Sequence, residues 1–317
     1  MEAVCTACLA SLLCLPAAGF EGGDDFNDNA VNSSKWGEDY ITGNGTLSET
    51  NQRLEFTVTS PSEEDETLRP WILGLGSKTN DWEIVLDVRN IALPAATNQV
   101  SSFGIEVVSL SDYGNSIYME IYASTLYMVP IQLRRGFKTA LLCNTGETAY
   151  ADSSHIGVTD GAVRLLYSPG PAVVTAYGDL NGSSDGYTWI KLGSFGVNGS
   201  SGETAIATWD LSANEPFAVA VYGFAANLVI TNATMYGDNF SALGLVSIQP
   251  DLNMTNRGSS FGPSWPHSAL GFRLEGSVSL KPSDWSAITN QPTTYGDRDV
   301  LFLTPQQPAM FYRLARP

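Results

Sequence analysis

Histidine and cysteine are scarce in this chain, and their scarcity removes several classes of chemistry. The 317 residues include 2 His and 4 Cys. His155 and His267 fall in different predicted domains, and no Ser-His-Asp arrangement is indicated. The cysteines Cys5, Cys8 and Cys14 lie close to the start and leave Cys143 alone further on, so no disulfide framework is expected.

Basic residues are also few. The chain has 16 Lys and Arg against 33 Asp and Glu, which gives a formal net charge of −17. A nucleic acid or an anionic lipid surface would be repelled over most of such a protein. We therefore expect no nucleic-acid partner, and the acidity is compatible with a soluble extracellular protein.

No apolar run is long enough for an ordinary membrane span, so none is expected in the mature chain. The opening segment 1–19, "MEAVCTACLASLLCLPAAG", is apolar and ends in small residues, as a secretory signal peptide does. It departs from that pattern because it carries Glu2 and no basic residue before Lys35. The segment predicts export to the extracellular space or the cell surface.

Helical patterns are missing as well, while hydrophobic residues make up 43 % and charged residues only 15 %. Short runs rich in Val, Ile, Phe, Tyr and Trp alternate with Gly, Asn, Asp, Ser and Pro, which is typical of strands separated by turns. This spacing, without crossover helices, favours antiparallel sheets packed as a jelly roll. The expected strands are 53–60, 81–91, 101–110, 115–124, 161–168, 172–180, 187–195, 216–224 and 227–240.

The character of the sequence changes near Gly244. We expect one domain over 20–244 and a second, smaller β-sandwich module over 245–317. The strands expected in the second lie around 245–248, 271–275, 285–288, 299–303 and 310–314.

Four stretches of the first domain resemble the concanavalin A-like lectin, or laminin G-like, jelly rolls of secreted bacterial proteins. They are "DDFND…SSKW", "DWEIVLDVRN", "AYGDLNGSSDGYTWIKLGSF" and "YGDNF". The resemblance implies that the first and last strands are neighbours in one sheet. Phe26 and Phe240 would then both enter the core, with Asp25 and Asp238 near a common edge.

The tail is similar to a C-terminal module of secreted proteins from planctomycete- and verrucomicrobium-like bacteria. The similarity rests on "GFRLEGSVSL", a following Trp285 and the terminal "FYRL". It implies a fibronectin type III-like sandwich without known catalytic residues.

A candidate sugar-binding face follows from the alternation in "SIYMEIYAS". Ile117, Met119 and Ile121 share one face of that strand, and the polar residues share the other. If Glu106 and Glu120 are cross-strand neighbours, their Cβ atoms would be about 5 Å apart. Aromatic rings and carboxylates on one face suit a sugar, although an ordinary solvated sheet face is an equal alternative. The candidate residues are Glu106, Tyr118, Glu120, Tyr122 and Arg164.

Two close carboxylates also suit a retaining glycosidase. The glycosidases of this superfamily carry an E-x-D-x-x-E pattern along one strand, and its polysaccharide lyases carry Arg, Gln-His and Tyr-Lys motifs. This sequence has neither, so a non-catalytic role is expected, with a glycoside hydrolase or polysaccharide lyase as the alternative.

Calcium is the only cofactor that the sequence suggests, as a structural ion. The loop "DLNGSSDG" has oxygen-bearing residues at alternate positions, but it lacks the Gly and Glu of a helix–loop–helix site and also reads as a hairpin loop. A second group of candidate ligands lies in the two similar stretches "DDFND" and "YGDNF". The candidate ligands are Asp25, Asp28, Asp179, Asn181, Asp185 and Asp238.

Together these observations predict an exported all-β protein, a concanavalin A-like jelly roll followed by a small β-sandwich. Its expected role is to bind an extracellular glycan or a cell-surface component. A structural or adhesive subunit is the further alternative, because one jelly roll hosts many activities.

Overall fold

The computed structural model describes thirteen stretches of the chain. The predicted leader, all four cysteines and both histidines lie outside them. The described residues are 20–76, 79–109, 115–125, 132–142, 148–152, 157–196, 217–247, 252–257, 260–266, 272–279, 281–295, 298–303 and 310–315.

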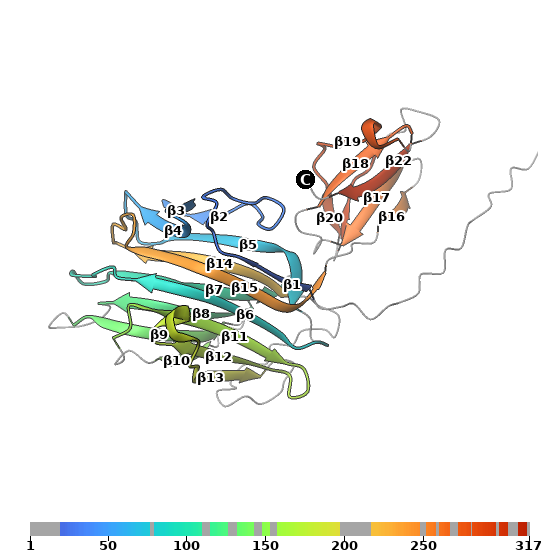
Figure 1. Ribbon diagram of the computed structural model, residues 1–317. Helices are drawn as coiled ribbons and strands as arrows, with labels where there is room; N and C mark the ends of the chain where they lie inside the picture. The colour runs from blue at the N-terminus through green and yellow to red at the C-terminus, as the bar shows by residue number, and fades with distance from the viewer. Residues whose placement is uncertain are drawn as a thin grey trace, which may run out of the picture.

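Two antiparallel sheets form the first part of the chain and pack face to face (Figure 1). Sheet I has the order β10-β9-β8-β7-β14-β5, with β2 paired to β5, and sheet II has the order β13-β12-β11-β6-β15, with β1 and β4-β3 paired to β15. The late strand β14 lies between the early strands β7 and β5, as crossed connections in a jelly roll require. The predicted all-β jelly-roll sandwich is confirmed.

The strands of sheet I are β2 (Tyr40–Thr42), β5 (Asp65–Gly76), β7 (Val100–Ser109), β8 (Ser116–Ser124), β9 (Arg134–Leu142), β10 (Thr148–Asp152) and β14 (Phe217–Ala226). Those of sheet II are β1 (Phe20–Asp24), β3 (Gly45–Thr50), β4 (Arg53–Val58), β6 (Trp82–Asn90), β11 (Asp160–Ser168), β12 (Val173–Asp179), β13 (Ile190–Gly196) and β15 (Met235–Ser247). The 3-10 turn η1 (Gly182–Asp185) lies between β12 and β13.

The core lies between the two sheets and follows the two-residue period of the strands. Ile117, Met119 and Ile121 of β8 are fully buried in it, as their alternation predicts. Sheet II supplies residues such as Leu86 and Val163 to the same apolar cluster. The other face of β8 is therefore left for polar residues.

The first and last strands of the jelly roll pair as expected. Asp24 of β1 stands opposite Phe240 of β15, and both Phe26 and Phe240 are buried. The carboxylate of Asp24 accepts hydrogen bonds from the indole Nε1 of Trp36 at 2.9 Å and from the backbone N–H of Phe26 at 3.1 Å. These bonds fix the turn that follows β1, where Phe26 has a φ of 50°.

The predicted strand 227–240 is wrong in its first half. β15 begins only at Met235, and the preceding residues Asn227 and Ala233, with φ values of 53° and 63°, belong to no strand. The segment is a turn with a single bridge between Ile230 and Val58. At its other end β15 continues to Ser247, where it pairs with β5 and joins the two sheets.

The remaining strands pair among themselves in two small sheets, drawn at one end of the molecule in Figure 1. Trp265 and Leu274 of these sheets share an apolar cluster with Ala218 and Val108 of sheet I, so the module packs against the jelly roll. Its likeness to fibronectin type III stays a prediction. The elements are β16 (Asn253–Arg257), β17 (Ser260–Pro266), β18 (Arg273–Ser277), η2 (Pro282–Asp284), β19 (Ser286–Ala287), β20 (Thr293–Tyr295), β21 (Arg298–Val300) and β22 (Phe311–Ala315).

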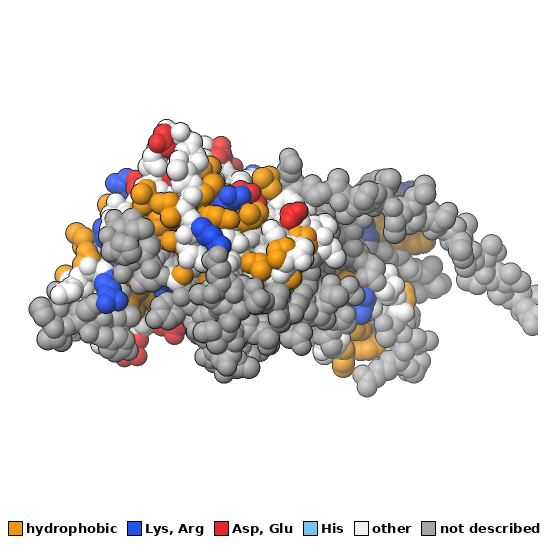
Figure 2. Space-filling view, turned by 90° about the horizontal axis from the view of Figure 1, so that it is seen from below, with side chains coloured by type: hydrophobic (Ala, Val, Ile, Leu, Met, Phe, Trp, Pro, Cys, Tyr) orange, Lys and Arg blue, Asp and Glu red, His pale blue; other side chains and the backbone are white. Residues whose placement is uncertain are grey.

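Basic and apolar side chains are interspersed on the side of the molecule seen from below, among the residues coloured there (Figure 2).

Among the described residues, no helix is long and apolar enough to cross a membrane.

Candidate functional site

Polar and aromatic side chains gather on the face of sheet I that points away from the core. We call this the tyrosine–glutamate face, and it comprises Glu66 of β5, Glu106 of β7, Tyr118 and Glu120 of β8, Lys138 of β9 and Tyr222 of β14. These residues alternate with core residues along their strands, and the register between strands brings them together.

One row across the sheet runs through Tyr222, Gly104, Glu120 and Lys138. Gly104 has no side chain between its two neighbours, so the hydroxyl of Tyr222 donates across β7 to Oε2 of Glu120 at 2.5 Å. A Cβ at Gly104 would lie 2.1 Å from the carbonyl oxygen of Met119. Glycine at this position therefore serves both the strand packing and the hydrogen bond.

The adjacent row places Glu106 opposite Tyr118. Glu106 and Glu120 share the face as predicted, but they are diagonal neighbours and not direct partners, because Glu120 stands opposite Gly104. Diagonal pairs in an antiparallel ladder are about 7–8 Å apart, which is wider than the expected 5 Å.

The face has a buried floor and a partly exposed rim. Glu120 and Tyr222 each have an exposed fraction of 5 %, although they point away from the core. Glu66, Glu106 and Tyr118 are half-buried around them, and the side chain of Lys138 is 37 % exposed. A ligand would meet the rim first.

Lys138 already forms an ammonium contact on this face. Its Nζ lies 3.7 Å from Oε1 of Glu120 and 5.2 Å from the centroid of the Tyr118 ring. The rings of Tyr118 and Tyr222 are in an edge-on arrangement with centroids 6.2 Å apart. Carboxylate and tyrosine ring together therefore hold one cation.

Burial and mutual repulsion shift the acidities of the face. Burial raises the pKa of Glu106 to about 7, and the charges of Glu66 and Glu120 add to this rise. A hydrogen bond from Ser116 lowers the pKa but does not offset the burial. Burial also raises the pKa of Glu66, with Glu64 and Glu120 adding to it. The pKa values of Tyr118 and Tyr222 are raised by burial and then by Glu120. Near neutral pH, Glu106 therefore exchanges readily between its neutral and charged forms.

Comparison with known proteins gives structural neighbours only. No protein-family model and no curated protein matches the chain. A lectin from Bauhinia forficata in complex with GalNAc is 12 % identical with a TM-score of 0.41, over 73 % of this chain and 100 % of that one. The CBM2 module of the evolved Dit of Lactobacillus casei BL23 phage J-1 is 8 % identical with a TM-score of 0.46, over 73 % and 98 %.

A pseudo β-1,3-glucanase of Mycobacterium tuberculosis is 16 % identical with a TM-score of 0.39, over 70 % of this chain and 98 % of that one. All three TM-scores are below 0.5. The description of the fold therefore rests on the strand order and register given above.

Four of the five candidate residues predicted from the sequence lie on sheet I, namely Glu106, Tyr118, Glu120 and Tyr122. Tyr122 lies on the same side of β8 as Tyr118 and Glu120, one row further along, and is buried. Arg164 does not belong there, because β11 pairs with β6 and β12 in sheet II. It forms an ion pair with Glu83 at 2.9 Å and lies over the ring of Tyr177.

Three residues of the face were not expected from the sequence, namely Glu66, Lys138 and Tyr222. Tyr222 does stand at an outward position in the predicted strand 216–224, which is the signal that could have found it. Glu66 and Lys138 lie in strands that were not predicted.

The proposed calcium ligands are mostly engaged in turns. Asp25 and Asp28 each accept a hydrogen bond from the backbone N–H two residues on, at 3.3 and 3.2 Å. Asp179 accepts from the N–H groups of Asn181 and Thr188 at 3.0 and 2.5 Å, which closes the hairpin loop after β12. These are the contacts of turn-forming aspartates.

Asn181 precedes the turn η1 and Asp185 lies at its end, where both are exposed. Asp238 accepts from the N–H of Asn239 at 2.8 Å, and burial raises its pKa with Asp87 and Asp25 adding to it. In the part of the chain that the structure describes, no three acidic, histidine or cysteine side chains are grouped as a metal site. A calcium ion stays a prediction.

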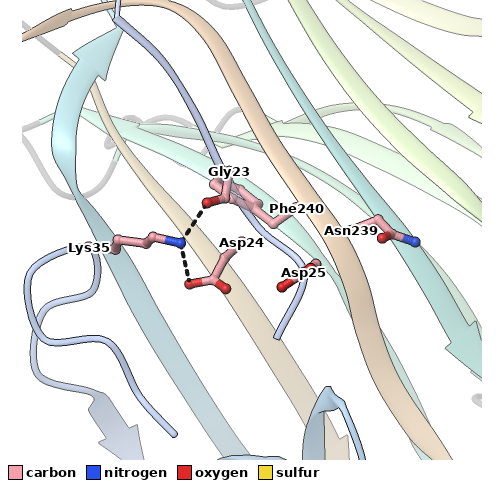
Figure 3. Close-up of a pocket in the computed structure, with 6 residues that line it drawn as sticks. All are labelled: Gly23, Asp24, Asp25, Lys35, Asn239 and Phe240. Atoms are coloured by element: carbon pink, nitrogen blue, oxygen red, sulfur yellow. Dashed lines mark hydrogen bonds and ion pairs between the residues drawn. The ribbon is translucent and has the colours of Figure 1, made fainter. Parts of the chain in front are cut away.

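An open pocket of 450 Å³ lies where β1 meets β15, on sheet II (Figure 3). Nζ of Lys35 is 2.9 Å from the carbonyl oxygen of Gly23 and 3.5 Å from the carboxylate of Asp24. Asp24 also accepts the hydrogen bond from Trp36, so the polar groups of this pocket already stabilise the N-terminal turn. For that reason we place the candidate site on the tyrosine–glutamate face and not in this pocket. The pocket is lined by Gly23, Asp24, Asp25, Lys35, Asn239 and Phe240.

Proposed function

We propose that this protein is exported and binds carbohydrate on the tyrosine–glutamate face without catalysing a reaction. The observation that carries the proposal is the half-buried ring of Tyr118 bordered by the carboxylates of Glu106 and Glu120 on one sheet face. A sugar presents an apolar C–H face and several hydroxyl donors. An aromatic ring fits the first, and carboxylates accept from the second.

The floor of the face supports the proposal because it is fixed before a ligand arrives. Tyr222 and Lys138 hold the carboxylate of Glu120 from two sides, so its orientation costs little further entropy on binding. The rim residues Glu106 and Tyr118 supply the groups that a sugar would contact. The apolar leader supports export.

Glycoside hydrolysis is the second candidate, and one observation favours it. A glycosidase needs one protonated and one ionised carboxyl group, and the pKa of Glu106 is about 7 beside Glu120. Binding fits better, because both oxygens of Glu120 already have partners in Tyr222 and Lys138. With an exposed fraction of 5 %, the carboxylate of Glu120 also offers little access to an anomeric carbon.

A glycan array with two readouts tests the proposal. We expect the full chain to be retained by at least one glycan, with or without added calcium, and the retained glycan to keep its mass after incubation with the protein in solution. Absence of retention under both conditions contradicts carbohydrate binding. Shortened products that Glu106→Gln abolishes would assign the face to hydrolysis instead.

A further inference from the structure

The rim carboxylates Glu66 and Glu106 differ from Glu120 in one respect. Glu120 pairs with Lys138, whereas no Lys or Arg among the described residues forms an ion pair with Glu66 or Glu106. Both side chains are half-buried on the same face. Two carboxylates without an ion pair to a described residue thus lie on the face where Glu120 and Tyr118 already hold one ammonium group.

The contact of Lys138 shows which chemistry this face accepts. Its ammonium is bound by a carboxylate at 3.7 Å and the ring of Tyr118 at 5.2 Å. Glu106 stands directly opposite the same ring on the neighbouring strand. A second ammonium group at the rim would therefore find the same pair of partners, a carboxylate and a tyrosine.

We propose that the sugar bound on the tyrosine–glutamate face carries a free amino group, and that Glu106 binds its ammonium beside the ring of Tyr118. The proposal rests on the carbohydrate-binding function proposed above. An acidic sugar would instead bring a like charge to a rim of carboxylates, and an N-acetylated sugar would leave Glu106 without a counter-charge.

The acidity of the rim gives the proposal a second consequence. Because the pKa of Glu106 is about 7, most of the free protein carries a proton there at about pH 5.5, where the amine of an amino sugar is protonated as well. An ammonium favours the charged carboxylate, so binding of an amino sugar releases that proton. A neutral sugar in the same place releases none.

Three β-1,4-linked hexamers that differ only at C2 test this directly: glucosamine, N-acetylglucosamine and glucose. We expect the full chain to bind the glucosamine hexamer on the order of tenfold more tightly than either other hexamer. Calorimetry at about pH 5.5 in two buffers of different ionisation enthalpy should show proton release for the glucosamine hexamer alone.

Glu106→Gln should remove both the tenfold preference and the proton release. Asp160→Asn removes one exposed charge on sheet II and should change neither. Hexalysine controls for the general attraction of an acidic chain to polycations, and its binding should be equal in both variants. A preference that survives in Glu106→Gln, or is lost equally in Asp160→Asn, overturns the proposal.

Failure of this inference is distinct from failure of the proposed function. Equal binding of the three hexamers, or retention of other glycans on the array while the glucosamine hexamer fails to bind, overturns the amino-sugar inference and leaves carbohydrate binding intact. Absence of any glycan binding contradicts both.

Discussion

Trp36→Ala is expected to lower the free energy of unfolding of the jelly roll by about 3–5 kcal/mol. The indole is fully enclosed, with its centroid 4.9 Å from that of Trp71 and 5.0 Å from that of Phe240. Its Nε1 also donates to Asp24, so the substitution leaves a buried carboxylate without that donor. One side chain therefore ties the turn after β1 to β5 and β15.

Urea denaturation of the full chain measures this effect, and hydrogen exchange locates it. Backbone amides of β1 should exchange faster in the variant, because the strand loses its anchor. Tyr40→Ala is the control, since Tyr40 lies nearby in β2 and is 65 % exposed, and it should cost less than about 1 kcal/mol. A loss below about 1 kcal/mol for Trp36→Ala would refute the anchoring role.

Glu49→Gln is expected to stabilise the protein at pH 8 and not at pH 5. Glu49 is buried on β3, and its carboxylate oxygens accept no hydrogen bond from the described residues. Arg69 is the nearest cation, at 3.6 Å, but its Nε and Nη2 donate to Asp39 at 2.7 and 2.9 Å. Burial, with the charge of Asp24 adding to it, raises the pKa of Glu49 to about 7.

The direction in which the free energy of unfolding changes with pH follows from the linkage between proton binding and folding. A carboxyl group whose pKa is raised by folding contributes stability below its unfolded pKa and loses it as the pH rises through the folded value. Between pH 5 and pH 8 the wild type should therefore lose about 1–3 kcal/mol relative to Glu49→Gln. Glu38→Gln, at an exposed site, should follow the wild type. Parallel pH profiles for wild type and Glu49→Gln would contradict the assignment.

The alternating strands could be read from the sequence because their pattern is local. In β8 the apolar period of two directly gave the core residue Met119 and the outward residues Tyr118 and Glu120. The pairing of the two ends of the jelly roll followed from the resemblance and is confirmed by the register of β1 with β15.

β5 could not be predicted because Pro70 and its glycines interrupt the pattern of a strand. The structure accommodates Pro70 because the edge of β5 on which its carbonyl accepts from Gly37 faces the short segment around Trp36, while the full strand β14 lies on the other side. Missing β5 also meant missing Glu66.

The order of the strands in each sheet also could not be predicted from the sequence. Tyr222 reaches Glu120 only because β14 lies beside β7, and the two residues are 102 positions apart in the chain. Arg164 was placed on the wrong sheet for the same reason, since periodicity gives the face of a strand but not its neighbours.

We place carbohydrate binding on the face of sheet I that carries Tyr118. The most direct test of this placement is the affinity of the full chain for a glycan retained on the array, compared among wild type, Tyr118→Ala and Tyr177→Ala. Both tyrosines are half-buried rings beside a basic side chain, but Tyr177 lies on sheet II. We expect Tyr118→Ala to weaken binding about fivefold to tenfold and Tyr177→Ala to leave it within about twofold. Unchanged affinity in a folded Tyr118→Ala variant, or a larger loss in Tyr177→Ala, would contradict it.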